Sequence, residues 1–181
     1  LEEMKVIVEE AHRVGKKVAA HAIGDLATRI AVEAGADSVE HAYTIPDDVL
    51  KMMAEKKIFL VPTDYPAEFY LSLYGFNSDT PAEQVKQITD GTNQFVKANG
   101  ERLARAVKFG VRIAAGSDEY YQVKGKTRGQ ASLMMFRAYL AAGMSPLEII
   151  RAATVNNAEL LAGESASFGS LEKGKYADII A

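Results

Sequence analysis

The chain has 181 residues, a net charge of −3 at pH 7 and no cysteine. Its length suffices for one domain with a sizeable core, and the lack of cysteine excludes disulfides and thiolate metal sites. The slightly negative charge, with no block of Lys or Arg, argues against nucleic acid or an anionic membrane as a partner.

Short apolar runs alternate with amphipathic helical patterns along most of the chain. The segments rich in glycine, proline or polar residues at 64–79 and 119–129 are expected to be loops. The predicted helices are 3–14, 25–34, 46–56, 80–109 with a break near 99–100, 130–142 and 146–161. The predicted strands are 18–21, 38–41, 58–62, 111–116 and 177–181.

The alternation of strands with helices of 10–15 residues predicts an α/β fold with parallel strands. A complete TIM (β/α)8 barrel needs about 250 residues. The four barrel-type strands before residue 120 therefore predict about half of such a barrel.

Three residues that can bind a metal or move a proton follow predicted strands. His21 ends the run 18–21, His41 ends the run 38–41, and Asp118 follows the run 111–116. The carboxyl ends of barrel strands converge on one mouth, so these residues are candidates for one metal site. For a single histidine, a core residue with a hydrogen-bond partner is the commoner outcome. Asp118 alone could equally be a helix cap or a turn residue.

The motifs around these residues resemble those of the amidohydrolase superfamily. Residues 20–25 (AHAIGD), 38–42 (SVEHA) and 115–118 (AGSD) are similar to its fifth-, sixth- and eighth-strand motifs. Residues 152–161 and 169–180 resemble a late helix and the return into a small β-sandwich. The similarity is strongest to the imidazolonepropionase-like and Xaa-Pro dipeptidase (prolidase) branch.

This resemblance implies that the chain is the C-terminal half of the barrel, strands five to eight. Residues 1–163 would form the half-barrel, and 164–181 would be a return strand toward a composite β domain. It assigns His21 and His41 to one metal and Asp118 to a second metal and to general-base catalysis, with Zn²⁺ as the expected ion. The family also uses a His-x-His pair and a lysine or glutamate on earlier strands, and the sequence has no His-x-His.

Further residues near the predicted mouth are candidates for substrate binding. Thr63, Asp64 and Tyr65 follow the third barrel-type strand, and Tyr120, Tyr121 and Arg128 lie in the loop after Asp118. Arg128 could hold a carboxylate through two hydrogen bonds. For each of these residues, packing of the loop or simple solvation is the alternative.

The resulting hypothesis is hydrolysis of an amide C–N bond in a dipeptide, an Xaa-Pro-like substrate or a cyclic amide by metal-activated water. The alternative is a catalytically incomplete half-barrel that acts as a structural or oligomerising unit. Its partner would be a second copy covering the open edges at 18–21 and 111–116, or the missing N-terminal half. A phosphate-binding half-barrel is disfavoured because no Gly-rich loop precedes a helix. No run is long enough to span a membrane and no signal peptide opens the chain, so we expect a cytoplasmic location.

Overall fold

The computed structural model describes residues 1–163 and 166–179. It is an α/β structure around one parallel sheet in the order β1-β2-β3-β4. The strands are β1 (Ala19–Ala22), β2 (Ser38–His41), β3 (Phe59–Val61) and β4 (Arg112–Ile113). The predicted parallel βα organisation is therefore confirmed, although β4 is shorter than the predicted strand 111–116.

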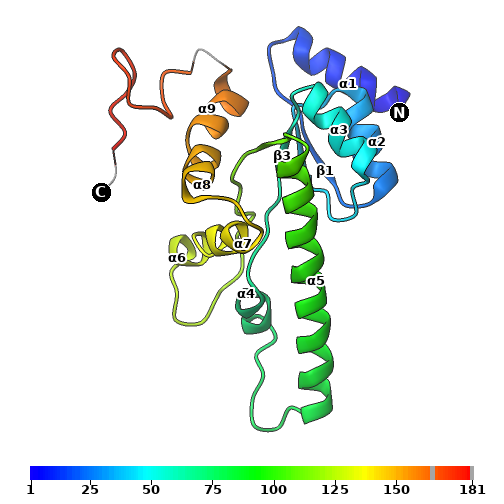
Figure 1. Cartoon of the computed structure of the whole chain (residues 1–181), viewed down its shortest axis with the longest axis vertical. Helices are drawn as coiled ribbons and strands as arrows, with labels where there is room; N and C mark the ends of the chain where they lie inside the picture. Colours follow the sequence, from blue (N-terminus) through cyan, green and yellow to red (C-terminus); the bar gives the residue numbers. More distant parts are fainter. Residues whose placement is uncertain (164–165, 180–181) are drawn as a thin grey trace.

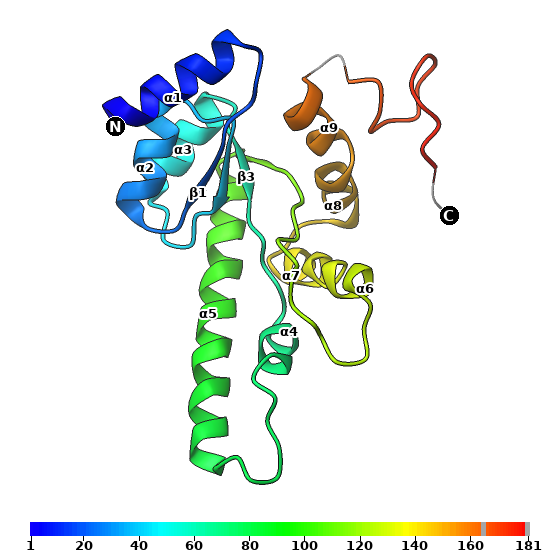
Figure 2. The same ribbon diagram turned by 180° about the vertical axis from the view of Figure 1, so that it is seen from behind.

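Three helices cover one flank of the sheet, as Figures 1 and 2 show. These are α1 (Glu2–Arg13), α2 (Asp25–Ala34) and α3 (Asp47–Glu55). Each turns an apolar face inward, with Val8, Val32 and Leu50 buried in turn. Gly35 ends α2 in the left-handed conformation, as glycine commonly does.

The long helix α5 (Ala82–Lys108) extends well beyond the sheet and has α4 (Ala67–Ser72) beside its lower half (Figure 1). The predicted break near 99–100 is wrong, because the helix is continuous there. A glycine inside a helix costs only about 1 kcal/mol relative to alanine. Burial of Asn99, Leu103 and Ala106 outweighs this cost. The short α4 lies within the segment predicted to be a loop.

The other flank carries four short helices in place of the two predicted ones. They are α6 (Arg128–Ser132), α7 (Met135–Ala141), α8 (Pro146–Ala153) and α9 (Val155–Ala162). The break between α8 and α9 falls at Thr154, whose φ of −125° and ψ of −86° are not helical. The capping box of Ser145 and Glu148 at the start of α8 is present.

The free edge of β4 is covered by the junction of α8 and α9. Asn156 Nδ2 donates to Ile113 O (2.8 Å), Asn157 Nδ2 donates to Ala115 O (2.9 Å), and Ala115 N donates to Ala152 O (3.0 Å). The expectation that 111–116 is an open edge is therefore wrong. At the other side of the sheet, β1 pairs only with β2 among the described residues.

The chain beyond α9 does not form the predicted strand where it is described. Residues 177–179 have no regular secondary structure, and residues 180–181 lie outside the described part. A strand requires a pairing partner, and none of the described strands pairs with this tail. Its described residues lie instead against α8 and α9, where Phe168, Gly169 and Ile179 line a cavity together with Ala153 and Ala158. Within the described residues, no helix has the length and apolar character needed to cross a bilayer.

Candidate functional site

The two strand-end histidines lie side by side at the carboxyl ends of β1 and β2. Their ring centroids are 4.5 Å apart in an edge-on arrangement. The strand register pairs His21 with Glu40 and Ala22 with His41, so simple alternation would put the two rings on opposite faces. His41 has a φ of +71°, and this left-handed backbone redirects its side chain toward His21.

Left-handed backbone recurs at two other predicted site residues. Thr63, after β3, has a φ of +54°, and Asp118, after β4, has a φ of +46°. This conformation is uncommon for residues other than glycine and is unusual for a β-branched threonine. Such strain persists only where the surroundings hold it, and it concentrates at functional sites. Three strand ends of this sheet thus carry the same signature.

A single cavity of about 220 Å³ connects these residues. His21, His41 and Asp118 all line it, as do Thr63 and several aromatic side chains. His21 and Asp118 are exposed at its rim, whereas His41 is buried. The aromatic lining residues are Tyr43, Tyr65, Phe69, Tyr70, Tyr120 and Tyr121.

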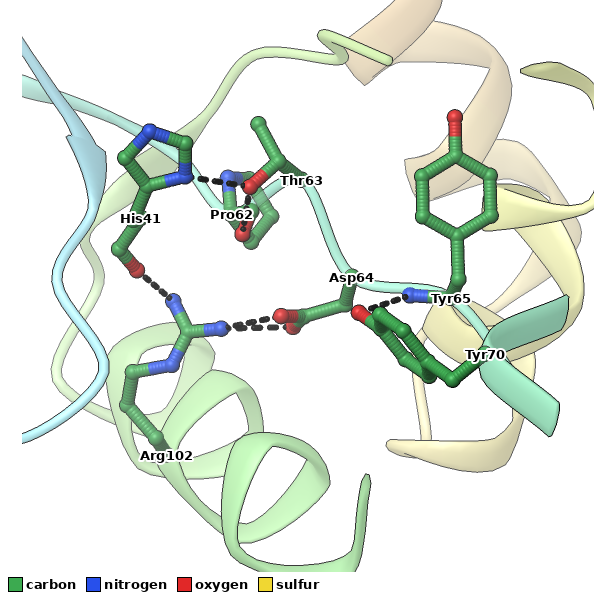
Figure 3. A network of polar contacts seen from close by, with 7 residues as sticks. All are labelled: His41, Pro62, Thr63, Asp64, Tyr65, Tyr70 and Arg102. Carbon is green, nitrogen blue, oxygen red and sulfur yellow. Dashed lines mark hydrogen bonds and ion pairs between the residues drawn. The ribbon is translucent and has the colours of Figure 1, made fainter. Parts of the chain in front are cut away.

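The hydrogen bonds around Thr63 favour one tautomer of His41. The Thr63 hydroxyl donates its one proton to the carbonyl oxygen of Pro62 (2.7 Å). It lies 2.7 Å from His41 Nδ1, and with its proton already committed it must accept there. This arrangement favours the tautomer of His41 that is protonated on Nδ1, which leaves the lone pair of Nε2 free. Figure 3 shows the contact between His41 and Thr63. A metal-binding histidine typically has its second nitrogen held in this way.

Burial and charge act on the ionisable groups of the site. Burial, reinforced by His21, lowers the pKa of His41, against the opposing effect of Asp118. The imidazole is therefore neutral at pH 7, which is the form that binds metals. Burial also raises the pKa of Glu40, and the negative charge of Asp118 adds to the rise. The hydrogen bond that Glu40 accepts from Ser38 opposes it.

Asp64 is placed differently from the other predicted residues. Its side chain is 4% exposed, and both carboxylate oxygens accept hydrogen bonds from Arg102 Nη2 at 2.6 Å. Burial raises the pKa of Asp64 to about 6, with the Arg102 guanidinium opposing the rise. The carboxylate is directed at Arg102 on α5 (Figure 3) and does not line the cavity of the histidines, a placement that favours a structural role over a substrate contact.

The remaining predicted residues divide between the cavity and the surface. Tyr65 stacks on Phe69 at 3.9 Å and donates from its hydroxyl to Ser117 O, which ties the end of β3 to the segment before Asp118. Tyr120 and Tyr121 are exposed at the rim and bond each other through their hydroxyls. Arg128 is exposed at the start of α6 and borders a separate cavity formed by residues 121–128.

Sequence reasoning missed several residues of this region, among them Arg102, Tyr43, Phe69 and Tyr70. Arg102 lies on the buried face of α5 together with Asn99, Leu103 and Ala106. Its position could have been predicted, because a charged residue at the helical spacing of an apolar face is unusual. Tyr43 lines the cavity with its ring centroid 5.7 Å from that of His41. Its position two residues after a strand-end histidine was the only hint.

These donors could make up only part of a metal site. Within residues 1–163 and 166–179, no three histidine or acidic side chains come close enough together to hold an ion by themselves. Two adjacent imidazoles, one with a fixed free Nε2, nevertheless suit Zn²⁺, which takes histidine nitrogen as a ligand. The residues fit a divalent metal as contributors to a larger ligand set.

The whole chain, residues 1–181, matches the model of the amidohydrolase family, so the protein belongs to that family. This confirms the resemblance drawn from the strand-end motifs. The chain is 35% identical over 181 residues to ochratoxinase of Aspergillus niger and 29% identical over 182 residues to imidazolonepropionase of Symbiobacterium thermophilum. These matches cover 99% and 98% of this chain.

Solved structures agree with this assignment. A Xaa-Pro dipeptidase with bound methionine superposes with a TM-score of 0.74 at 29% identity, covering 97% of this chain and 41% of the other. The structure of Aspergillus niger ochratoxinase gives a TM-score of 0.73 at 32% identity, covering 98% and 38%. The chain spans about a third of the length of the curated relatives, 35% and 36%.

Proposed function

We propose that this chain is the part of a metal-dependent amidohydrolase that contributes barrel strands five to eight, and that it serves the hydrolysis of amide C–N bonds. Residues 1–163 form the C-terminal half of the barrel, and residues 164–181 lead toward a composite β domain. The observation that carries the proposal is the pair His21 and His41, 4.5 Å apart between ring centroids, with Asp118 lining the same cavity.

The metal would be held in part by the two histidines, with Asp118 at a second position, and Zn²⁺ is the ion that we propose. His41 would bind through Nε2, because Nδ1 is engaged by Thr63. A bound divalent cation supplies Lewis-acid polarisation of the amide carbonyl. The remaining ligands of a complete site would come from outside the described donor set.

Asp118 is the proposed general base and acid. Its carboxylate is exposed at the cavity rim, where an attacking water can reach it. A carboxylate oxygen takes a proton as the water oxygen bonds to the carbonyl carbon. It then gives that proton to the amide nitrogen as the C–N bond breaks, which releases a carboxylic acid and an amine.

The substrate is proposed to be a small peptide or amide. The cavity of about 220 Å³ is walled by tyrosines and one phenylalanine, which suits an apolar ring or side chain on a compact substrate. Similarity to a Xaa-Pro dipeptidase supports a dipeptide. Tyr65, Tyr120, Tyr121 and Thr63 are the proposed contacts at the cavity, and Arg128 could approach only by movement of its loop.

Metal binding by the 181-residue chain tests the assignment directly. Isothermal calorimetry with Zn²⁺ should show binding that is lost in His21→Ala and His41→Ala. His12→Ala is the matched control, since His12 lies on α1 and pairs with Asp37 at 2.8 Å. Equal binding in all three variants would refute the assignment. Zn²⁺-dependent cleavage of an Xaa-Pro dipeptide, abolished in Asp118→Asn, would extend it to the reaction.

A second function is favoured by the incomplete donor set within the described residues. The chain could instead be a structural unit that pairs through the open edge of β1 with a second copy or with a complementary half-barrel. Light scattering after size-exclusion chromatography separates the two: a dimer without bound Zn²⁺ supports this reading, and a monomer that binds Zn²⁺ supports the first.

A further inference from the structure

A fully buried arginine ties together the ends of two strands. Arg102, on α5, is 0% exposed. Its Nη1 donates to the carbonyl oxygen of His41 at 2.7 Å, and its Nη2 lies 2.6 Å from both carboxylate oxygens of Asp64. Figure 3 shows the guanidinium lying between the two strand ends, with His41 on one side and Asp64 on the other.

This arrangement is costly to bury. Taking a guanidinium and a carboxylate out of water carries a desolvation penalty that their attraction often fails to offset, and apolar replacements are often as stable. Arg102 Nε has no hydrogen-bond partner among the described residues, so even the donor set is not fully satisfied. A role in fold stability alone therefore explains the arginine poorly.

The contacts of Arg102 fall on the strained backbone of the site. His41, whose carbonyl it holds, has a φ of +71°, and Thr63, which precedes Asp64, has a φ of +54°. Strained conformations of this kind persist only where neighbouring groups over-determine them. The planar guanidinium, with several donors in fixed directions, can fix two backbone segments at once in a way that lysine cannot.

We infer that Arg102 is a positioning residue for the proposed metal site. It acts through the backbone of His41 and through Asp64, and it keeps the Thr63 hydroxyl against His41 Nδ1 so that Nε2 stays free and directed into the cavity. This inference rests on the proposed function only in assuming that His41 Nε2 binds the metal. The hydrogen-bond geometry itself does not depend on a metal.

The test uses the 181-residue chain with a paired substitution. Arg102→Met together with Asp64→Asn removes both charges and leaves no isolated ion in the core. Arg105→Met is the matched control. Arg105 lies one turn further along α5 and likewise contacts a carboxylate, Asp47, and a carbonyl, Ile45 O at 3.4 Å, but away from the cavity.

The first readout is the tautomer of His41, measured by multiple-bond ¹H–¹⁵N NMR without metal at a pH well above the ordinary histidine value of about 6.5. The wild-type chain and Arg105→Met should show a single form protonated at Nδ1. The paired variant should show a mixture of both tautomers. A single Nδ1-protonated form in the folded paired variant would overturn the inference. If that variant does not fold, Arg102→Lys takes its place with the same expected mixture and the same overturning result.

The second readout is Zn²⁺ affinity by calorimetry. Loss of a group that orients a metal ligand typically costs 10- to 100-fold in affinity, and we expect a loss of this size in the paired variant but not in Arg105→Met. Guanidinium ion added to Arg102→Ala should restore part of the affinity. If the wild-type chain binds no Zn²⁺, the proposed function fails while the tautomer experiment still decides the role of Arg102. If the wild type binds Zn²⁺ and the paired variant binds it equally well, the inference fails while the proposed function stands.

Discussion

His41 and Thr63 are joined by one hydrogen bond of 2.7 Å that determines which imidazole nitrogen is available in the cavity. Both residues are buried, and both have left-handed backbone at the end of a strand. The bond links neighbouring strands β2 and β3 where their side chains meet the cavity. The chemistry proposed for His41 therefore depends on a hydroxyl from the next strand.

Replacing Thr63 by valine should show this dependence. Valine keeps the shape and β-branching of threonine, so the backbone strain is unchanged, but His41 Nδ1 and the Pro62 carbonyl lose their partner. We expect the free energy of unfolding to fall by about 1–3 kcal/mol, as for a buried polar group left unpaired. Zn²⁺ affinity should fall by about 10-fold or more. Urea denaturation and calorimetry measure the two effects.

Thr63→Ser is the control for the valine variant, because serine keeps the hydroxyl and loses only a methyl group. The serine variant should bind Zn²⁺ nearly as well as the wild type. Equal Zn²⁺ affinities for the serine and valine variants would contradict the role assigned to the hydroxyl.

Gly116 allows β3 and the segment before Asp118 to approach closely. A Cβ at this position would lie 2.5 Å from Val61 Cγ1, well inside van der Waals contact. Gly116→Ala should therefore destabilise the chain by about 1–3 kcal/mol through overpacking. Urea denaturation of Gly116→Ala, Val61→Ala and the double variant forms a cycle. Since Val61→Ala removes the clashing methyl, the double variant should be more stable than the sum of the single effects predicts. Strict additivity would show that the two positions do not clash.

Much of the fold was predictable because its elements follow local rules. The helix predicted at 25–34 matches α2, where an apolar face and a terminal glycine mark the boundaries. The parallel sheet followed from the alternation of strands and helices. The continuity of α5 through Asn99 and Gly100 was not predictable, since it depends on tertiary burial that overrides the local preference of glycine.

The sequence predicted that His21, His41 and Asp118 lie near one another, and all three line one cavity, but it did not predict how the two imidazole rings meet. Strand-end positions identified His21, His41 and Asp118, yet the alternation of side chains would have separated the two histidines. The left-handed backbone of His41 brings the two rings together, and the amino-acid sequence around His41 does not predict this backbone conformation. The role of Arg102 depends on its contacts with Asp64 and His41, which precede it in the sequence by 38 and 61 positions. No local sequence pattern encodes contacts over such separations.

Asn156 and Asn157 should be important for stability because they take the place of a neighbouring strand. Their side-chain amides donate to Ile113 O and Ala115 O at the outer edge of β4. Asn157→Ala should lower the free energy of unfolding by about 1–3 kcal/mol, since a partly buried carbonyl loses its donor. Asn93→Ala, at an exposed position of α5, is the control and should change stability by no more than about 0.5 kcal/mol. Urea denaturation measures both, and equal effects would show that the edge contact contributes nothing.

Asp37 should make stability depend on pH at the opposite end of the sheet. Burial alone would raise the pKa of this carboxyl, but hydrogen bonds from Lys17, His12 and the Val18 amide outweigh burial and lower it. A lowered folded-state pKa means that Asp37 stabilises the fold fully above its unfolded pKa of about 3.9, and that this contribution is lost as the pH falls through the lower folded value.

Asp37→Asn should therefore cost about 1 kcal/mol near pH 6, a modest figure because Lys17 and His12 are exposed to solvent. The difference from wild type should shrink below about pH 4. Urea denaturation across pH 3 to 7 tests this, with Asp48→Asn, an exposed partner of Arg29, as a control expected to show a smaller change. A difference that stays constant or grows toward low pH would contradict the assignment.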